Sequence, residues 1–117
     1  MNRKRFETNI DFADAEDLNF QMSDDCKLSI VIKLWDESPA KLVFSNILRF
    51  SYSRGDIISG FYEVNNSPFL DEALSQYFIK VPLNHSFKLY QLEDVSGNLF
   101  IEVVAEHVIV VVGAGPA

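Results

Sequence analysis

Residues 67–78 read SPFLDEALSQYF, and within this stretch apolar side chains recur with the spacing of a helix. Ser67 is a preferred N-cap residue, and Pro68 suits the first helical position because its missing N–H would have no partner there. The apolar residues at 69, 70, 73, 74, 77 and 78 fall on one face of a 3.6-residue period. We therefore predict one amphipathic helix over about residues 68–79, whose apolar face covers a sheet.

On both sides of this helix the hydrophobic period is two, as in strands that bury one face. The predicted strands are residues 18–22, 28–34, 42–52, 57–64, 87–92 and 99–112. Asn46 is polar in the middle of the third of these and predicts a bulge or a strand break. Residues 93–98, EDVSGN, predict a hairpin turn between the last two strands.

The short connections between these segments favour antiparallel pairing. The fold class that we expect is α+β, a curved antiparallel sheet of about six strands with one packed helix. A chain of 117 residues is the size of one domain, so we expect a single domain over residues 1–117 with flexible ends at 1–16 and 113–117. Val108–Val112 is apolar on both faces, which predicts a central strand or an interface strand.

The charge of the chain is strongly acidic, with seventeen acidic and ten basic residues and a net charge of −7. Residues 7–25 contain seven acidic residues and no basic one. Such a surface repels phosphate backbones, so we expect no nucleic-acid partner. The same field attracts a basic protein and speeds its association. Alternatively, the acidity only keeps the protein soluble.

The location of the protein is inferred from its apolar runs and its cysteine content. No apolar run is long enough for a membrane helix and no secretory signal is visible, so we expect no membrane partner and a cytoplasmic location. The single cysteine, Cys26, excludes a disulfide framework and fits a reducing compartment. The neighbouring carboxylates of Asp24 and Asp25 disfavour its thiolate, so we expect no catalytic cysteine.

Three further patterns bear on cofactors, metals and catalysis. Residues 108–117, VIVVVGAGPA, are similar to the start of a dinucleotide-binding fingerprint, but the helix that should follow the glycine turn is missing, so we expect no cofactor. His85 and His107 have no partners spaced for catalysis, and Glu106 and His107 would point to opposite faces of a strand, so we expect no metal site. No catalytic motif is present, and we expect a protein that is not an enzyme.

The candidate binding site combines the single tryptophan with acidic residues of predicted turns. Trp35 lies near a strand end beside Asp36 and Glu37, a composition frequent in binding hot spots. Asp24 and Asp25 belong to the neighbouring predicted turn. We predict that these five residues bind a partner and that no residue is catalytic. Alternatively, Trp35 covers the rim of the sheet and the acidic pairs serve turn formation.

Three segments carry a resemblance to a known class of proteins. Leu34-Trp35-Asp36 ends a predicted strand, Leu42-Val43-Phe44 begins the next, and Ser67-Pro68-Phe69-Leu70 opens the helix before a final strand pair. Over about residues 18–112 this arrangement resembles small acidic immunity proteins of bacterial toxin–immunity systems, and the uncharacterised families around them. The resemblance implies tight binding to a cognate toxin domain, whose active site or exit surface is blocked. Many toxin nucleases are basic, which suits an acidic inhibitor.

Three functions remain open at this point. The first is a non-enzymatic cytoplasmic binding protein, and in its most specific form an immunity protein that neutralises a basic cognate toxin. The second is a small-ligand-binding module, because a curved sheet and a helix can enclose an apolar pocket. The third is a self-associating structural subunit, a homodimer formed through the C-terminal strand Val108–Val112.

Overall fold

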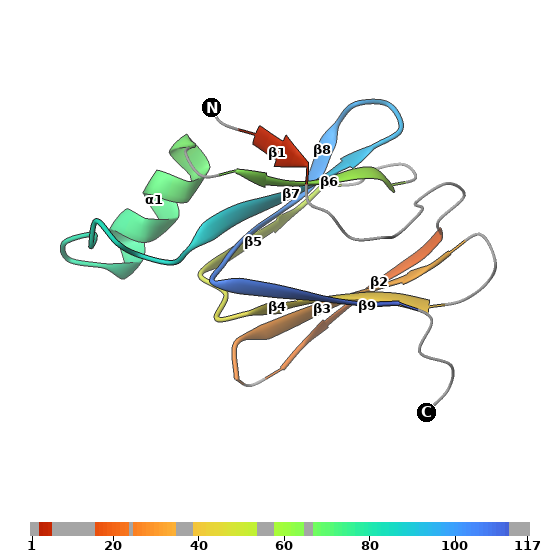
Figure 1. Ribbon diagram of the computed structural model, residues 1–117, viewed down its shortest axis with the longest axis horizontal. Coiled ribbons are helices and arrows are strands. Elements are labelled where there is room, and N and C mark those ends of the chain that lie inside the picture. The colour runs from red at the N-terminus through yellow and green to blue at the C-terminus, as the bar shows by residue number, and fades with distance from the viewer. Residues whose placement is uncertain are drawn as a thin grey trace.

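The protein is built from antiparallel sheet and one helix over the residues that the structure describes. The computed structural model describes residues 3–5, 16–23, 25–34, 39–53, 58–64 and 67–112. The expected α+β class and the antiparallel pairing are confirmed within these ranges. The expectation of one curved sheet of about six strands is wrong, because these residues form a five-stranded sheet and a four-stranded sheet (Figure 1).

The element bounds are β1 Arg3–Arg5, β2 Glu16–Met22, β3 Lys27–Lys33, β4 Pro39–Ser45, β5 Arg49–Tyr52, β6 Ile58–Val64, α1 Pro68–Tyr77, β7 Lys88–Asp94, β8 Leu99–Ala105 and β9 His107–Val112. Sheet A has the strand order β1-β6-β7-β8-β5, and sheet B has the order β2-β3-β4-β9. Strand β1 was not predicted, because three consecutive basic residues show no alternation. Most of the remaining residues expected to form flexible ends lie outside the described residues.

The strand count exceeds the prediction partly because two long predicted strands each break in two. Asn46 separates β4 from β5, and Glu106 separates β8 from β9. Since β4 pairs with β9 while β5 pairs with β8, the β4–β5 segment passes from sheet B to sheet A and the β8–β9 segment passes from sheet A to sheet B, at one shared corner (Figure 1). Strands that switch sheets through a bend are typical of such corners. Of the two positions expected for Val108–Val112, the central one is wrong, because β9 lies at an edge of sheet B among the described strands. The interface strand stays a prediction.

Hydrogen bonds to Glu106 tie this corner together. The backbone of Asn46 is left-handed, with φ of 58°, and its side-chain amide donates to the Glu106 carboxylate. The Ser86 hydroxyl donates to the other carboxylate oxygen of Glu106. The Glu106 N–H donates to the Ser45 carbonyl at 3.2 Å. One side chain therefore joins both crossing segments and the loop before β7.

The main core fills the space between the two sheets. Alternate residues of β3 and β4 are buried, as the period of two predicts. The Phe44 side chain is fully buried, with its ring centroid 6.1 Å from that of Phe61 and 5.4 Å from that of Tyr90. The core also contains Leu28, Ile30, Ile32, Leu34, Ala40, Leu42, Ile58, Leu92, Phe100, Ile101, Val103 and Ala105.

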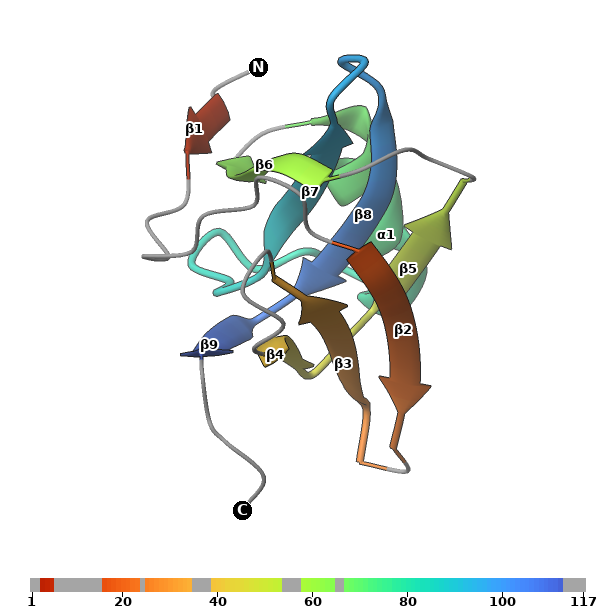
Figure 2. The ribbon, with the colours of Figure 1, turned by 90° about the vertical axis from the view of Figure 1, so that its right-hand side faces the viewer.

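A second core lies between α1 and the outer face of sheet A, so the molecule has three layers (Figures 1 and 2). The helix buries Leu70, Ala73 and Leu74, which cluster with Val64, Phe87, Leu89 and Val104 of the sheet side. The predicted start is confirmed, because the Ser67 hydroxyl accepts from the Leu70 N–H at 3.1 Å and Pro68 begins the helix. The helix ends at Tyr77, because Phe78 is extended.

The hydrogen bonds to Glu106 at the corner predict that the stability of the fold depends on pH. Hydrogen bonds from Ser86 and then Asn46, with a smaller attraction from His107, hold the pKa of Glu106 below its ordinary 4.5. A carboxyl whose pKa is lower in the folded state stabilises the fold above its unfolded pKa, and this contribution is lost as pH falls through the folded pKa. We expect Glu106→Gln to lower the melting temperature at pH 7, with a difference from wild type that shrinks below about pH 4.

Circular dichroism melts of both proteins between pH 3 and pH 7 measure this difference. Asn46→Gly is the matched control, because glycine accepts the left-handed backbone while the donor to Glu106 is lost. It should weaken the same pH dependence without adding strain. A melting-temperature deficit of Glu106→Gln that is equally large at pH 3 and pH 7 would contradict the prediction.

Candidate protein-binding surface

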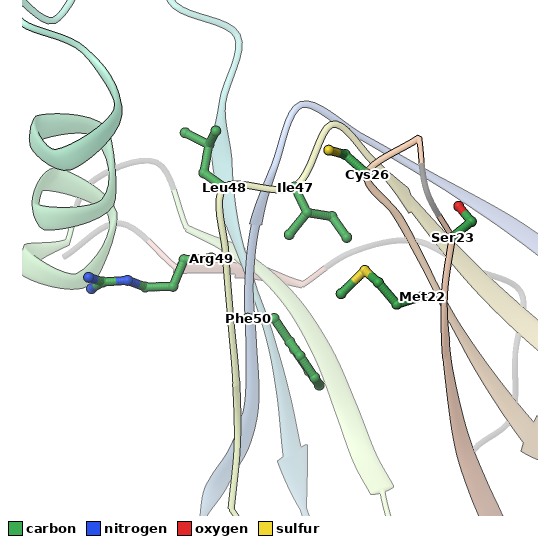
Figure 3. A pocket seen from close by; sticks show the side chains of 7 residues that line it. All are labelled: Met22, Ser23, Cys26, Ile47, Leu48, Arg49 and Phe50. Atoms are coloured by element: carbon green, nitrogen blue, oxygen red, sulfur yellow. The ribbon is translucent and has the colours of Figure 1, made fainter.

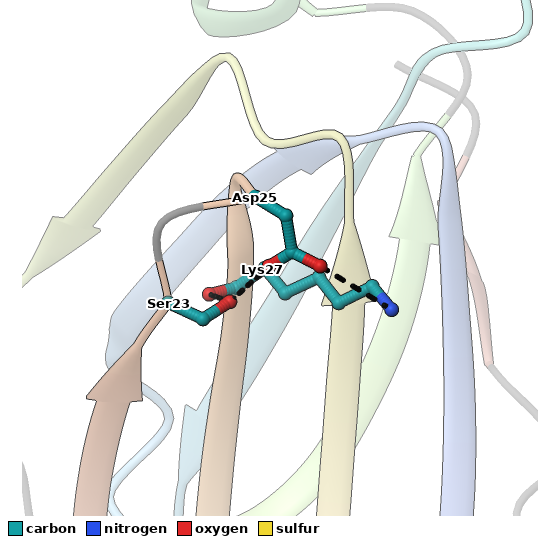
Figure 4. Close-up of polar contacts among 3 residues, drawn as sticks. All are labelled: Ser23, Asp25 and Lys27. Carbon is teal, nitrogen blue, oxygen red and sulfur yellow. Dashed lines mark hydrogen bonds and ion pairs between the residues drawn. The ribbon is translucent and has the colours of Figure 1, made fainter.

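One of the five predicted binding residues, Asp25, lies in the described part of the chain, while Asp24, Trp35, Asp36 and Glu37 lie outside it. The Asp25 side chain is exposed in the turn between β2 and β3. It accepts a hydrogen bond from the Ser23 hydroxyl, and Lys27 Nζ lies 3.7 Å from Asp25 Oδ2 (Figure 4). The Ser23 hydrogen bond, with Lys27 contributing, lowers the pKa of Asp25, so this group is a carboxylate at neutral pH.

The described neighbours of the two predicted turns lie far apart. Asp25 precedes β3, whereas Leu34, the residue before Trp35, follows it. A strand of seven residues is roughly 20 Å long at a rise of about 3.3 Å per residue. A partner that contacts Asp25 and also Leu34 would have to reach along the whole of β3.

The β2–β3 turn places Cys26 in a strained backbone conformation. The Ser23 N–H donates to the Lys27 carbonyl at 2.9 Å, and Cys26 has φ of 60°. This left-handed region favours glycine, because a Cβ atom there approaches the backbone too closely. The exposed free thiol of Cys26 therefore occupies a position for which glycine is the better residue.

We expect Cys26→Gly to raise the free energy of unfolding by about 0.5–1 kcal/mol, because relief of the strain exceeds the extra entropy of glycine in the unfolded chain. Urea unfolding of the two proteins measures the change. Cys26→Ala is the control, since it removes the thiol and keeps the Cβ atom. A glycine variant no more stable than the alanine variant would show that the backbone carries no such strain.

An apolar pocket of about 310 Å³ lies between the β2–β3 turn and residues 47–50, which follow the corner at Asn46 (Figure 3). Its lining residues are Met22, Ser23, Cys26, Ile47, Leu48, Arg49 and Phe50. The side chain of Arg49 points away toward α1, where its guanidinium donates to Glu72 at 3.3 Å and to Gln76. The volume is at the small end of the range for ligand pockets. None of its lining residues belongs to the helix.

The titratable side chains are dispersed in the described part of the chain. No three His, Cys, Asp or Glu residues of the described ranges are placed to hold a metal ion. His107 is exposed at the start of β9, and the His85 ring lies 6.5 Å from that of Phe87 in the loop before β7. Burial, with the charge of Glu63 adding to it, raises the pKa of Tyr90 to about 12, so its phenol stays protonated at neutral pH. A search of the described ranges finds no helix long and apolar enough to span a bilayer.

The most exposed apolar side chains of the described residues follow the end of α1. Ile79 and Leu83 have relative exposures of 111% and 104%, and Tyr77 has 60%. We call these three residues the α1-loop surface. Aliphatic side chains are common on protein surfaces singly, but three large exposed apolar groups within seven residues of sequence make this segment a candidate interaction site.

The loop that carries this surface is anchored by aromatic packing. The Phe78 and Phe87 ring centroids lie 6.0 Å apart, and both residues belong to or pack on the second core. The Tyr77 ring packs edge-on against Phe78 at 4.8 Å. Between these anchors, the His85 N–H donates to the Pro82 carbonyl at 3.4 Å and closes a turn. Aromatic residues and Val81 thus hold the loop on the second core, while the side chains of Ile79 and Leu83 stay in solvent.

Charges around the α1-loop surface are of both signs. Asp71 and Glu72 are the charged residues of α1, and both are exposed. Glu72 is paired with Arg49 at 3.3 Å, and Lys80 is exposed within the loop. Charges of both signs therefore lie on the helix and loop that carry the exposed apolar residues, and protein interfaces commonly combine apolar and polar groups. A preference for a basic partner has to come from the field of the whole chain, whose net charge is −7.

Sequence reasoning missed this surface, because it treated the residues after the helix only as a helix stop. A signal was present, since Ile79, Val81 and Leu83 flank Pro82 in a segment that cannot continue a helix. A comparison with known proteins finds no matching family model, no matching curated protein and no matching solved structure. The function is therefore argued from the exposed surfaces of this chain.

Proposed function

We propose that this chain is a binding protein that recognises another protein through the α1-loop surface. The observation that supports this most directly is the full exposure of Ile79 and Leu83 on a loop held in place by Phe78 and Phe87. Burying such a side chain is worth about 1.5–3 kcal/mol, and a partner would supply that burial. Tyrosine is enriched in binding hot spots, and Tyr77 is the last residue of α1, two positions before Ile79.

The charge of the chain favours a basic partner. A net charge of −7 raises the association rate with a positively charged protein, and this acceleration falls as salt screens the field. Taken with the resemblance to small acidic immunity proteins, the partner that we propose is a basic toxin domain. The chain would act in the cytoplasm as its non-catalytic inhibitor, by covering the surface that the toxin uses.

The test is a pull-down from a lysate of the source organism with the wild type and with Ile79→Ser/Leu83→Ser. We expect the wild type to retain one basic protein at low salt, and we expect the double variant to bind that protein at least about 100-fold more weakly. The matched control is Met22→Ser/Val95→Ser, because these residues have exposed fractions of 60% and 58% elsewhere on the molecule. The control should bind like the wild type.

Two results would reject the proposed surface. One is a double variant that binds the recovered protein as tightly as the wild type does. The other is equal loss in the control pair, which would show that apolar exposure in general holds the protein. Turnover of a defined substrate by the purified chain would reject the non-catalytic function itself.

A small-ligand function is the second candidate, and the 310 Å³ pocket at Met22, Ile47 and Phe50 supports it. Native mass spectrometry of the purified protein tests it directly. A stoichiometric small-molecule adduct that is lost on Ile47→Ser would favour this function. A spectrum containing the chain alone would leave the pocket as a surface hollow next to the corner.

A further inference from the structure

The edge of sheet B formed by β9 offers a second surface, distinct from the α1-loop surface. Within the described ranges β9 has a neighbouring strand on one side only, which is β4. The pairing is regular over six residues, from Ala40 with Val112 to Ser45 with His107. Alternate N–H and C=O groups of an edge strand point away from its neighbour, so β9 presents a row of backbone groups that another strand can pair with.

In the part of the chain that the structure describes, this edge lacks the sequence and pairing features by which proteins usually protect an edge strand. Strand β9 reads HVIVVV and contains no lysine, acidic residue or proline, and its pairing with β4 has no register shift. The opposite edge of the same sheet differs, since β2 contains Glu16 and Asp17 in its sequence and its pairing with β3 is irregular. The two edges of sheet B are therefore unequal, and β9 is the one open to pairing.

The two faces of β9 are both apolar, and they have different surroundings. Val108 and Val110 pack against the main core, whereas Ile109 and Val111 have exposed fractions of 58% and 39%. On the outer face Ile109 lies opposite Val43 of β4, and Val111 lies opposite the exposed Lys41. An apolar strip thus runs along the edge, and the cross-strand partner of Val111 is a lysine in a chain whose net charge is −7.

We propose that β9 pairs antiparallel with β9 of a second copy of this chain, so that two copies of sheet B form one continuous sheet. A two-fold axis makes such an edge complementary to itself, because each strand supplies the same groups in the opposite direction. Ile109 and Val111 of the two copies then lie on one face near the axis and cover each other. The other β-branched residues of β9 favour the extended backbone that the pairing needs.

The charge distribution permits a second copy at this edge and disfavours close contact elsewhere. Two chains of charge −7 repel each other, but β9 brings no lysine, arginine or acidic side chain to the contact. The two Lys41 side chains would be separated by three strand spacings, roughly 14 Å, which exceeds the Debye length of about 8 Å at physiological salt. Added salt should therefore strengthen this dimer, whereas it should weaken binding of a basic partner to the α1-loop surface.

Sedimentation velocity of the full chain, over protein concentrations from about 1 to 200 µM, tests the dimer. We expect the wild type to sediment as two chains in the upper part of this range, and Ile109→Lys to sediment as one chain throughout. The substitution places a lysine at the apolar contact, and lysine is a residue that protects many natural edge strands from pairing. Val95→Lys is the matched control, because Val95 has the same exposed fraction of 58% and lies outside β9. It should remain a dimer.

Three results would overturn the proposal. They are a wild type that is monomeric throughout, an Ile109→Lys variant that still dimerises, and a Val95→Lys variant that dissociates equally. Backbone amide exchange gives an independent measurement, with slower exchange in β9 of the wild type than in folded Ile109→Lys at equal concentration. Equal exchange rates would also overturn β9 pairing. These variants leave Ile79 and Leu83 unchanged. Failure of the β9 dimer therefore does not count against binding through the α1-loop surface, which the pull-down tests.

Discussion

Replacing Phe44 with alanine is expected to lower the free energy of unfolding by about 3–5 kcal/mol, a large share of the 5–15 kcal/mol typical of a domain. The ring is fully buried between the sheets and contacts the rings of Phe61 and Tyr90. Its removal loses apolar burial and leaves a cavity that the flanking strands cannot close. Urea unfolding measures the loss, which corresponds to a melting temperature lowered by roughly 10–20 °C.

Two companion variants keep this prediction testable. Val43→Ala changes the preceding residue of the same strand, on the opposite face, and should cost under about 1 kcal/mol because Val43 is only half-buried. Phe44→Leu retains most of the core volume and should remain folded if Phe44→Ala does not. Similar losses for Phe44→Ala and Val43→Ala would mean that the core does not lie between the sheets.

Leu70→Ala is the second large effect that we expect, with a loss of about 2–4 kcal/mol. Leu70 is 1% exposed and belongs to the cluster that fixes α1 on sheet A. Because this cluster is separate from the main core, the damage should be local. Amide exchange should accelerate in α1 by a larger factor than in β3, whereas Phe44→Ala should accelerate both.

Ser75→Ala is the control for the helix, since Ser75 is exposed on α1 and alanine is the better helix former. Its stability should lie within about 0.5 kcal/mol of the wild type. Uniform acceleration of exchange in α1 and β3 by Leu70→Ala would show that the helix and the sheets open as one unit. The two clusters would then have to be treated as a single core.

The helix was predictable from sequence because its signals are local. Ser67, Pro68 and the apolar positions between 69 and 78 all act within a few residues of one another, and the structure confirms the start at Pro68. The hairpin at 93–98 was predictable for the same reason, since Asp94 accepts hydrogen bonds from the Ser96 and Asn98 N–H groups and Gly97 has φ of 85°. Such turns depend on their own residues alone.

The division into two sheets was not predictable, because it depends on partners far apart in the chain. Period two is the same for strands of one sheet and of two sheets. Asn46 indicated a break, and its left-handed backbone confirms one, but the sequence does not show that Glu106 bends at the same corner. The edge position of β9 could not be predicted either, because the sequence HVIVVV suits a buried central strand as well as an unprotected edge strand.

The binding surface was the least predictable feature. The apolar face predicted for the helix includes Phe78, which does pack on the second core. The sequence pattern does not show which apolar side chains stay exposed to solvent after the loop packs on the second core. In the structure Ile79 and Leu83 are exposed. Of the acidic cluster proposed around Trp35, Asp25 alone lies in the described residues, and it is engaged with Ser23 and Lys27.

The shared corner also influences the order in which the strands pair during folding. The β2–β3 and β7–β8 pairs are hairpins that close over a few residues, whereas Ala40 meets Val112 about 70 residues away. Closing so long a loop costs entropy before the contacts repay it, which slows folding to the millisecond-to-second range typical of β-rich topologies. We expect the hairpins to assemble early and the pairing of β4 with β9 to be the late, rate-limiting event.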